Sequence, residues 1–139
     1  SEKGVSHENG VAINPEVKNL EDMSGTDRAR FEKMDEKARL EEAYKFAAPC
    51  PEVNVTPEVR QAGYESFVTT DDHLMHITGM VQDQNGTVYY ITKNSWGTER
   101  NTFGGYLNMS ESYVRAKTIY VLIHKDGIPK DMKKKLGIK

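Results

Sequence analysis

The pattern of apolar and polar residues changes along this chain, from helical spacing in the first half to strand-like alternation after residue 69. Apolar residues recur at helical spacing from a capping sequence at residue 24 to residue 47, with a break predicted near residues 34–35. A second helix is predicted over 56–65, because Thr56 is a good N-cap and Pro57 suits the first helical position. Most residues of these helices are charged or polar, so we expect the helices to coat a core rather than to form one.

The second half of the chain predicts a β-sheet. Residues 74–81 and 87–93 are typical of two strands, and the Asn85-Gly86 pair between them favours a hairpin turn. The remaining predicted elements are a strand at 105–109, a helical turn at 111–115, an apolar strand at 118–124 and a helix from Pro129 to Gly137. Helices followed by an antiparallel sheet indicate the α+β class.

The length of 139 residues and the 37% hydrophobic content fit one globular unit with a modest core. We therefore predict a single segment over residues 1–139, divided into a helical insertion at 1–68, an antiparallel sheet at 69–125 and a C-terminal helix and tail at 126–139. Within the insertion, residues 1–23 are expected to be a strand remnant followed by a loop.

Charge and cysteine content exclude several classes of partner. The net charge is −2, and the one basic run, Lys133-Lys134-Lys135, is interpreted as the solvated face of the last helix, so no nucleic-acid partner is expected. The sequence has no apolar run of membrane-spanning length and no signal-peptide pattern, so no membrane partner is expected either. The single cysteine, Cys50, excludes an internal disulfide framework and favours a reducing compartment, which we expect to be the cytoplasm.

The candidate site combines His73 with Asn94, which lies 21 residues further along the chain at the end of the second hairpin strand. Opposite residues of an antiparallel hairpin have numbers with a constant sum, which is 171 for a two-residue loop here and 167 for a four-residue loop. Both sums are odd, so either register places His73 and Asn94 on one face of the sheet. We prefer the second register, which sets the two residues directly opposite each other with Cβ atoms about 4.5–5.5 Å apart.

This residue pair suits thiol chemistry. A cationic imidazole can lower the pKa of a cysteine thiol from about 8.5 to about 3–4, and the thiolate is the nucleophile. The carbonyl of an Asn side chain can accept the second ring N–H and fix the orientation of the imidazole without adding a competing negative charge. We expect Trp96 to lay its indole over that hydrogen bond, and Asp72 either to tune His73 or to cap the loop before it.

The same residues have other interpretations. A single strand His is commonly structural or exposed, and Asn94-Ser95-Trp96-Gly97 is also compatible with a simple strand end. His73 and His76, near two aspartates, suggest a metal, but their separation of three sends the imidazoles to opposite faces of a strand. We therefore predict no metal and no cofactor.

The segments 72–79, 91–97 and 105–107 resemble the His and Asn segments of papain-like cysteine peptidases. The wider chain, including its first residues 1–4, is similar to the bleomycin hydrolase and aminopeptidase C branch. By position, His73 matches the catalytic His of the family and Asn94 the orienting Asn. The resemblance implies a papain-like fold, here truncated to an antiparallel β-rich right-hand domain with peripheral helices.

The resemblance also implies a function, namely a cytoplasmic thiol aminopeptidase that acts on peptide substrates and assembles as a homo-oligomer, a hexameric ring. The family segments that supply the oxyanion donor and the nucleophile are absent, and Cys50 lies between two prolines outside any Cys-Gly-Ser-Cys-Trp signature. The expected partner is therefore a Cys-bearing N-terminal half, and the 139 residues alone are expected to be inactive. The alternative is a degenerate, non-catalytic papain-like module that binds peptides or proteins.

Overall fold

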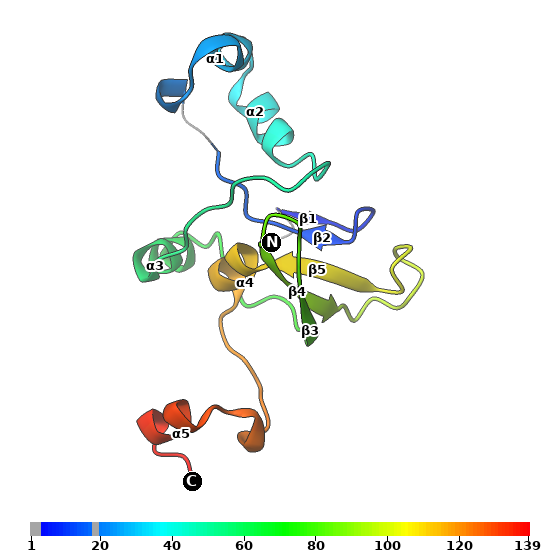
Figure 1. Cartoon of the computed structure of the whole chain (residues 1–139), viewed down its shortest axis with the longest axis vertical. Helices are drawn as coiled ribbons and strands as arrows, with labels where there is room; N and C mark the ends of the chain where they lie inside the picture. The colour runs from blue at the N-terminus through cyan, green and yellow to red at the C-terminus, as the bar shows by residue number, and fades with distance from the viewer. Residues whose placement is uncertain (1–3, 18–19) are drawn as a thin grey trace.

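A five-stranded sheet lies at the centre of the computed structural model, which describes residues 4–17 and 20–139 (Figure 1). The strands are β1 Val5–Ser6, β2 Val11–Ala12, β3 His76–Gln82, β4 Val88–Lys93 and β5 Tyr106–Ser110. Their order in the sheet is β1-β2-β5-β4-β3, and all neighbours are antiparallel except β2 and β5, which are parallel.

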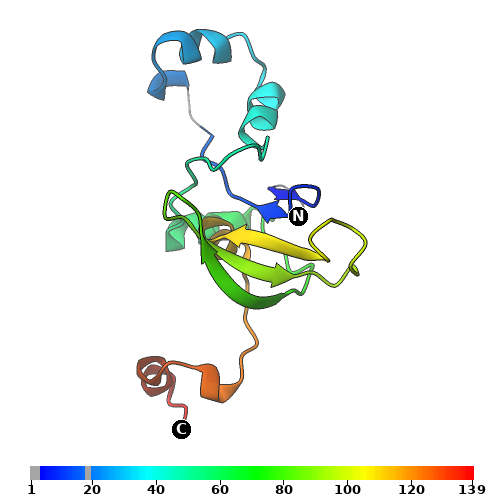
Figure 2. The same ribbon diagram turned by 45° about the vertical axis from the view of Figure 1, so that its right-hand side comes forward.

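The helices surround this sheet unevenly. They are η1 Leu20–Asp22, α1 Gly25–Phe31, α2 Glu36–Ala43, α3 Pro57–Glu65, α4 Glu111–Lys117, η2 Lys125–Gly127 and α5 Lys130–Leu136. In both views α1 and α2 lie at one end of the molecule and α5 at the other, with α3 and α4 nearer the sheet (Figure 2). The predicted α+β class, the break in the first helix and the Thr56 cap, whose hydroxyl accepts the Val59 N–H, are confirmed.

The strand predicted at 118–124 is wrong. The chain leaves α4 there as an extended connection without a strand partner among the described residues, and Leu122 is 98% exposed. Its β-branched and aromatic residues favour extended backbone, but a strand also needs a neighbouring ladder to satisfy its N–H and C=O groups. We refer to residues 119–123, all of them exposed apolar side chains, as the apolar arm.

The sheet also includes strands from the first part of the chain. Two strands from the first part, β1 and β2, belong to the sheet, and β2 introduces the parallel pairing with β5 through Val11↔Asn108 and Ala12↔Met109. The first residues of the resemblance, 1–3, lie outside the described residues. The consequence is that the segment near residue 7 lies beside the loop that connects β4 to β5.

Neither predicted hairpin register is correct. Opposite residues near the turn, such as Gln82↔Val88, have numbers that sum to 170, because the loop contains three residues and Gly86 adopts a positive φ of 83°. An extra residue, Thr78, then forms a bulge between Ile77 and Gly79, and its hydroxyl donates a hydrogen bond to the Ile91 carbonyl. Beyond the bulge, the numbers of opposite residues sum to 169. At the end of the hairpin that leads to His73 the sum is therefore odd, as in both predicted registers.

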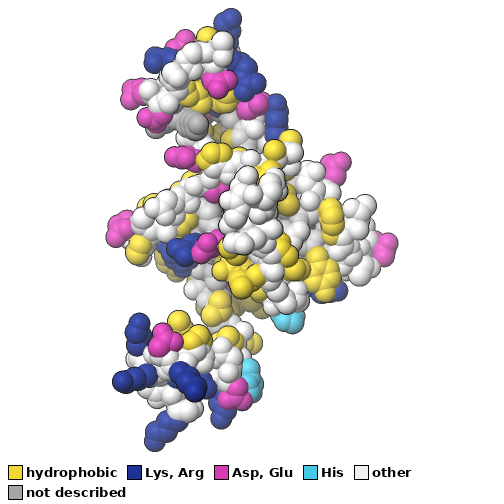
Figure 3. Space-filling model, viewed as in Figure 1, with side chains coloured by type: hydrophobic (Ala, Val, Ile, Leu, Met, Phe, Trp, Pro, Cys, Tyr) yellow, Lys and Arg dark blue, Asp and Glu magenta, His cyan; other side chains and the backbone are white. Residues whose placement is uncertain are grey.

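The core is small and lies where β2, β5 and α4 meet. It consists of Ala12, Leu107, Met109 and Tyr113, each at most 7% exposed. By contrast, nearly every residue of β3 is exposed, including Met80 at 68%. Yellow apolar side chains accordingly appear on the surface of the central part of the molecule (Figure 3). The outer strand and the apolar arm therefore lack cover within the described residues.

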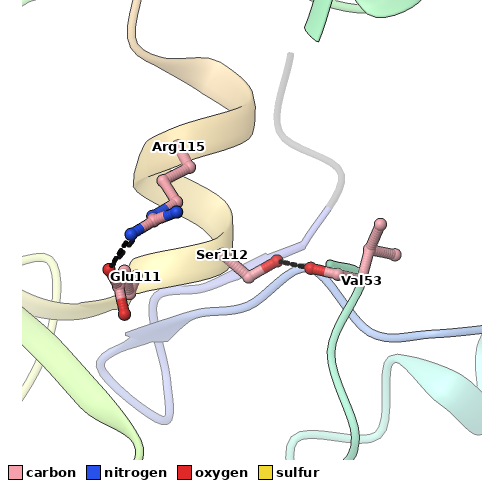
Figure 4. Close-up of polar contacts among 4 residues, drawn as sticks. All are labelled: Val53, Glu111, Ser112 and Arg115. Atoms are coloured by element: carbon pink, nitrogen blue, oxygen red, sulfur yellow. Dashed lines mark hydrogen bonds and ion pairs between the residues drawn. The ribbon is translucent and has the colours of Figure 1, made fainter. Parts of the chain in front are cut away.

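Polar contacts tie the connector before α3 to the sheet and to α4. The Glu52 carboxylate accepts hydrogen bonds from the Asn14 N–H and from the hydroxyl of Ser110, which is fully buried. The Ser112 hydroxyl donates to the Val53 carbonyl over 2.6 Å, on the side of α4 that faces the connector (Figure 4). These contacts hold together segments that are almost sixty residues apart in the sequence.

The loop between β4 and β5 is closed by a glycine contact. Gly105 has a φ of +82°, and a Cβ placed on it would lie 2.3 Å from the Gly97 carbonyl oxygen, so no larger residue fits without movement. Asn101 holds the same loop, because its side-chain oxygen accepts the N–H groups of Phe103 and Gly105. The loop carries Trp96 and begins at Asn94, so its closure positions both.

We predict that Gly105→Ala destabilises the chain more than Gly104→Ala, which serves as a matched control. Both positions have positive φ, which costs an Ala about 1–2 kcal/mol, but only Gly105 would also bring its Cβ against backbone atoms. We expect the clash to add about 1–3 kcal/mol in urea denaturation followed by circular dichroism. Equal losses for the two variants would show that the Gly97 contact does not close the loop.

Candidate active site

Asn94 directly follows β4, and its side-chain oxygen is held in one direction. The residue is 8% exposed, and its backbone N–H donates to the Gly105 carbonyl over 2.9 Å. The Ser95 N–H donates to Asn94 Oδ1 over 2.7 Å, which identifies this atom as the acceptor. The Asn94 carbonyl group is therefore fixed before any contact with a histidine is considered.

His73 lies three residues before β3 and contacts that oxygen. Its Nε2 is 2.8 Å from Asn94 Oδ1. An amide oxygen only accepts, so Nε2 carries the proton and Nδ1 is the lone-pair nitrogen of the neutral ring. The structure thus brings together the two residues that the sequence selected, although by a bulged hairpin rather than by either predicted register.

Trp96 lies against the imidazole of His73. The two ring centroids are 5.2 Å apart with an interplanar angle of 38°, and Trp96 is 37% exposed. Two further side chains contact the same indole, namely His7 at 4.9 Å between centroids and Arg100, whose guanidinium carbon lies 5.1 Å from the ring centroid. Sequence reasoning missed both residues, because no periodicity or motif connects residue 7 with the loop at 95–105.

Asp72 contacts the loop before His73. Its carboxylate accepts a hydrogen bond from the Thr70 hydroxyl over 3.0 Å. This contact between residues two positions apart supports the loop-capping alternative.

A pocket of about 360 Å³ adjoins Asn94 and the residue that follows His73. It is lined by Leu74, Met75, His76, Lys93, Asn94 and Ser95. Apolar side chains and one ammonium group thus border the pair, and His76 belongs to this surface. Among residues 4–17 and 20–139, no cluster of three or more His, Cys, Asp or Glu side chains is arranged to hold a metal.

Cys50 lies in surroundings that do not activate a thiol. Burial raises the pKa of the Cys50 thiol, and the Glu52 carboxylate adds to this effect. Burial, and then the Glu52 carboxylate, also raise the pKa of Tyr89 to about 12. Glu52, two residues after Cys50, contacts Ser110, which pairs with Tyr89, and Tyr89 lies five residues before Asn94, about 17 Å of extended chain. Cys50 therefore lies toward the opposite end of β4 from the His73 and Asn94 pair.

None of the helices in the described parts of the chain is both long and apolar enough to cross a membrane.

Two comparisons with known proteins match these features. A model of the Peptidase C1-like family matches residues 34–138, which include the sheet strands β3 to β5 and both members of the pair. Aminopeptidase C from Lactobacillus helveticus is 42% identical over 64 residues, which cover 45% of this chain and 14% of that protein. The chain therefore matches a small part of the relative's length. On the family match, this chain belongs to the Peptidase C1-like family, the papain-like peptidases.

Proposed function

We propose that this chain supplies the general base, His73, and the orienting residue, Asn94, of a cysteine-type aminopeptidase. The observation that carries the proposal is the 2.8 Å contact between His73 Nε2 and Asn94 Oδ1, in a chain of the peptidase family. The oxygen is itself fixed by the Ser95 N–H, so the imidazole is held in the tautomer that presents Nδ1 away from Asn94.

In this proposal Nδ1 of His73 takes the proton of a cysteine thiol. The resulting thiolate attacks the peptide carbonyl carbon and forms a C–S bond, and the C–N bond breaks as the imidazolium returns the proton to the leaving amine. A water molecule deprotonated by the same imidazole then hydrolyses the thioester and releases the thiol. Asn94 keeps the ring oriented through both steps, and Trp96 shields the hydrogen bond from water.

The nucleophile is proposed to come from a part of the protein other than these 139 residues. Cys50 is the one cysteine of the sequence, its thiol pKa is raised rather than lowered, and it lies toward the other end of β4. A nucleophilic cysteine requires the opposite environment, next to a cation or a helix N-terminus. The part that matches the relative covers only 14% of that protein, which leaves room for a Cys-bearing half.

We propose aminopeptidase activity in particular because the matched relative is an Aminopeptidase C. We propose that the substrates are peptides from which N-terminal residues are removed, and that the pocket beside Leu74 and Met75 contacts them. The single free cysteine favours a reducing compartment, and on this ground we place the protein in the cytoplasm.

The exposed apolar surfaces support the proposal that this chain binds a partner. The apolar arm and the outer face of β3 expose side chains such as Val121 at 71% and Met80 at 68%. Monomeric proteins rarely leave such surfaces in water, so we propose that the Cys-bearing half and further copies of the enzyme cover them.

In the full-length protein, we predict that His73→Ala lowers kcat/KM for an aminoacyl fluorogenic substrate by at least about 10³-fold, because it removes the base and the partner charge. Asn94→Ala should lower it by only about 10–100-fold, short of the about 10⁴-fold loss in a serine triad without its Asp. His124→Ala, at an exposed His remote in sequence from the site, is the matched control and should be neutral. Equal losses for His73→Ala and Asn94→Ala would exclude an orienting role for Asn94.

We predict that the purified 139-residue chain hydrolyses no aminoacyl substrate, since it holds a base and an orienting residue but no activated thiol. The assay is release of the fluorophore with and without a thiol-blocking reagent. Hydrolysis that is blocked by the reagent and abolished by Cys50→Ala would falsify the external nucleophile. If the full-length protein were also inactive while binding peptides, the non-catalytic module would be the better description.

The 139-residue chain should self-associate, because its apolar arm has no cover. We expect light scattering to show a mass that rises with concentration, and Leu122→Asp to reduce this rise by placing a charge in the arm. Gln84→Asp, which adds the same charge at the exposed hairpin turn, should have no effect. A constant monomer mass for the unmodified chain would contradict the proposed covered surface.

A further inference from the structure

His7 contacts the candidate site from the far end of the sequence. Its imidazole centroid lies 4.9 Å from that of Trp96 at an interplanar angle of 45°, and Trp96 in turn lies 5.2 Å from His73. The Nε2 atom of His7 is sealed from solvent and has no hydrogen-bond partner among the described residues. His7 therefore contributes ring surface to the indole rather than a hydrogen bond to a neighbour.

The turn that carries His7 is held firmly. The Ser6 hydroxyl accepts hydrogen bonds from the backbone and side chain of Asn9, and the Gly10 N–H donates to the His7 carbonyl. The Gly10 carbonyl accepts the Asn108 N–H over 2.7 Å, next to the parallel β2–β5 pairing. A Cβ on Gly10 would lie 2.4 Å from the ring of Phe103, so the turn also fits closely against the β4–β5 loop.

The indole of Trp96 depends on such neighbours for its position. It is 37% exposed and belongs to a loop outside the strands, between Gly97 and the end of β4. Arg100 places a cation over the ring. The contact with His7 links the indole to the sheet through β1 and β2.

We infer that His7 is a positioning residue, whose imidazole holds Trp96 against His73 and thereby keeps water from the hydrogen bond between His73 and Asn94. The catalytic consequence of this inference rests on the proposed function, whereas the packing of His7 against Trp96 does not. Removing the ring should free the indole, admit water to the hydrogen bond and loosen the imidazole of His73. A phenyl ring at position 7 should preserve the packing, because the contact uses ring surface.

Two measurements on the 139-residue chain test the packing without catalysis. Trp96 is the single tryptophan of the sequence, so acrylamide quenching of its fluorescence reports its exposure directly. We expect His7→Ala to raise quenching toward that of free indole and to speed exchange of the His73 Nε2 proton with water about ten-fold, by nuclear magnetic resonance. His7→Phe should retain the original values, and His124→Ala, which alters an exposed histidine, should change neither.

If His7→Ala failed to fold, judged by circular dichroism, His7→Gln would carry the same test, because it is polar and lacks the ring. Unchanged quenching and proton exchange in a folded ringless variant overturn the inference. In the full-length protein we expect the ringless variant to lower kcat about ten-fold with KM unchanged, as for a misplaced catalytic group. A full-length protein without peptidase activity would refute the proposed function, while quenching and exchange still decide the role of His7.

Discussion

The hydrogen bond from His73 Nε2 to Asn94 Oδ1 depends on segments that are distant in sequence. Asn94 directly follows β4 and is held through its backbone by Gly105, while its side-chain oxygen is set by the Ser95 N–H. His73 arrives from the chain before β3, and the bulge at Thr78 determines the register by which β3 approaches β4. A shift of one residue in that register would turn side chains to the opposite face of the sheet. The chemistry of the pair is thus inseparable from the geometry of one bulged hairpin.

The β3 side of the same hairpin is not covered by other parts of the described chain. Its neighbour β5 packs Leu107 and Met109 into the core against Tyr113 of α4, but β3 forms the edge of the sheet with exposed side chains on both faces. An exposed apolar edge strand invites pairing with another chain or segment. The edge and the apolar arm are therefore consistent with a chain that completes its core by contact with more protein, as the proposed Cys-bearing half would provide.

The sequence predicted helix starts and turns correctly where neighbouring residues in the chain determine them. The cap at Thr56 and the proline after it place the start of α3, and Asn85-Gly86 marks the hairpin turn. The pair itself was selected because its residue types and spacing suit thiol chemistry. Neither register is correct, because the observed three-residue loop and the bulge each lower the sum of opposite residue numbers by one from the two-residue alternative, to 170 and then 169, whereas the preferred sum was 167. Alternation alone encodes neither the loop length nor the bulge. Residues 118–124 have the composition of a strand, but pairing requires a partner ladder that composition does not report.

Contacts between segments far apart in the sequence could not be predicted from local sequence patterns. His7 reaches Trp96 only because β2 pairs in parallel with β5, which joins residues almost one hundred positions apart. Likewise, Glu52 contacts Ser110, 58 positions further along the chain, through a connector for which the sequence pattern predicted no contact. Parallel pairing of two-residue strands leaves almost no periodicity in the sequence, so these contacts become visible only in the structure.

The central claim is that the oriented imidazole of His73 ionises a cysteine thiol. The rate of alkylation of the nucleophilic cysteine by iodoacetamide, measured against pH in the full-length protein, tests this claim most directly. We predict that the cysteine reacts well below the ordinary thiol pKa of about 8.5, and that His73→Ala moves the profile back toward that value. Superimposable profiles for the two proteins would contradict the proposed role of His73.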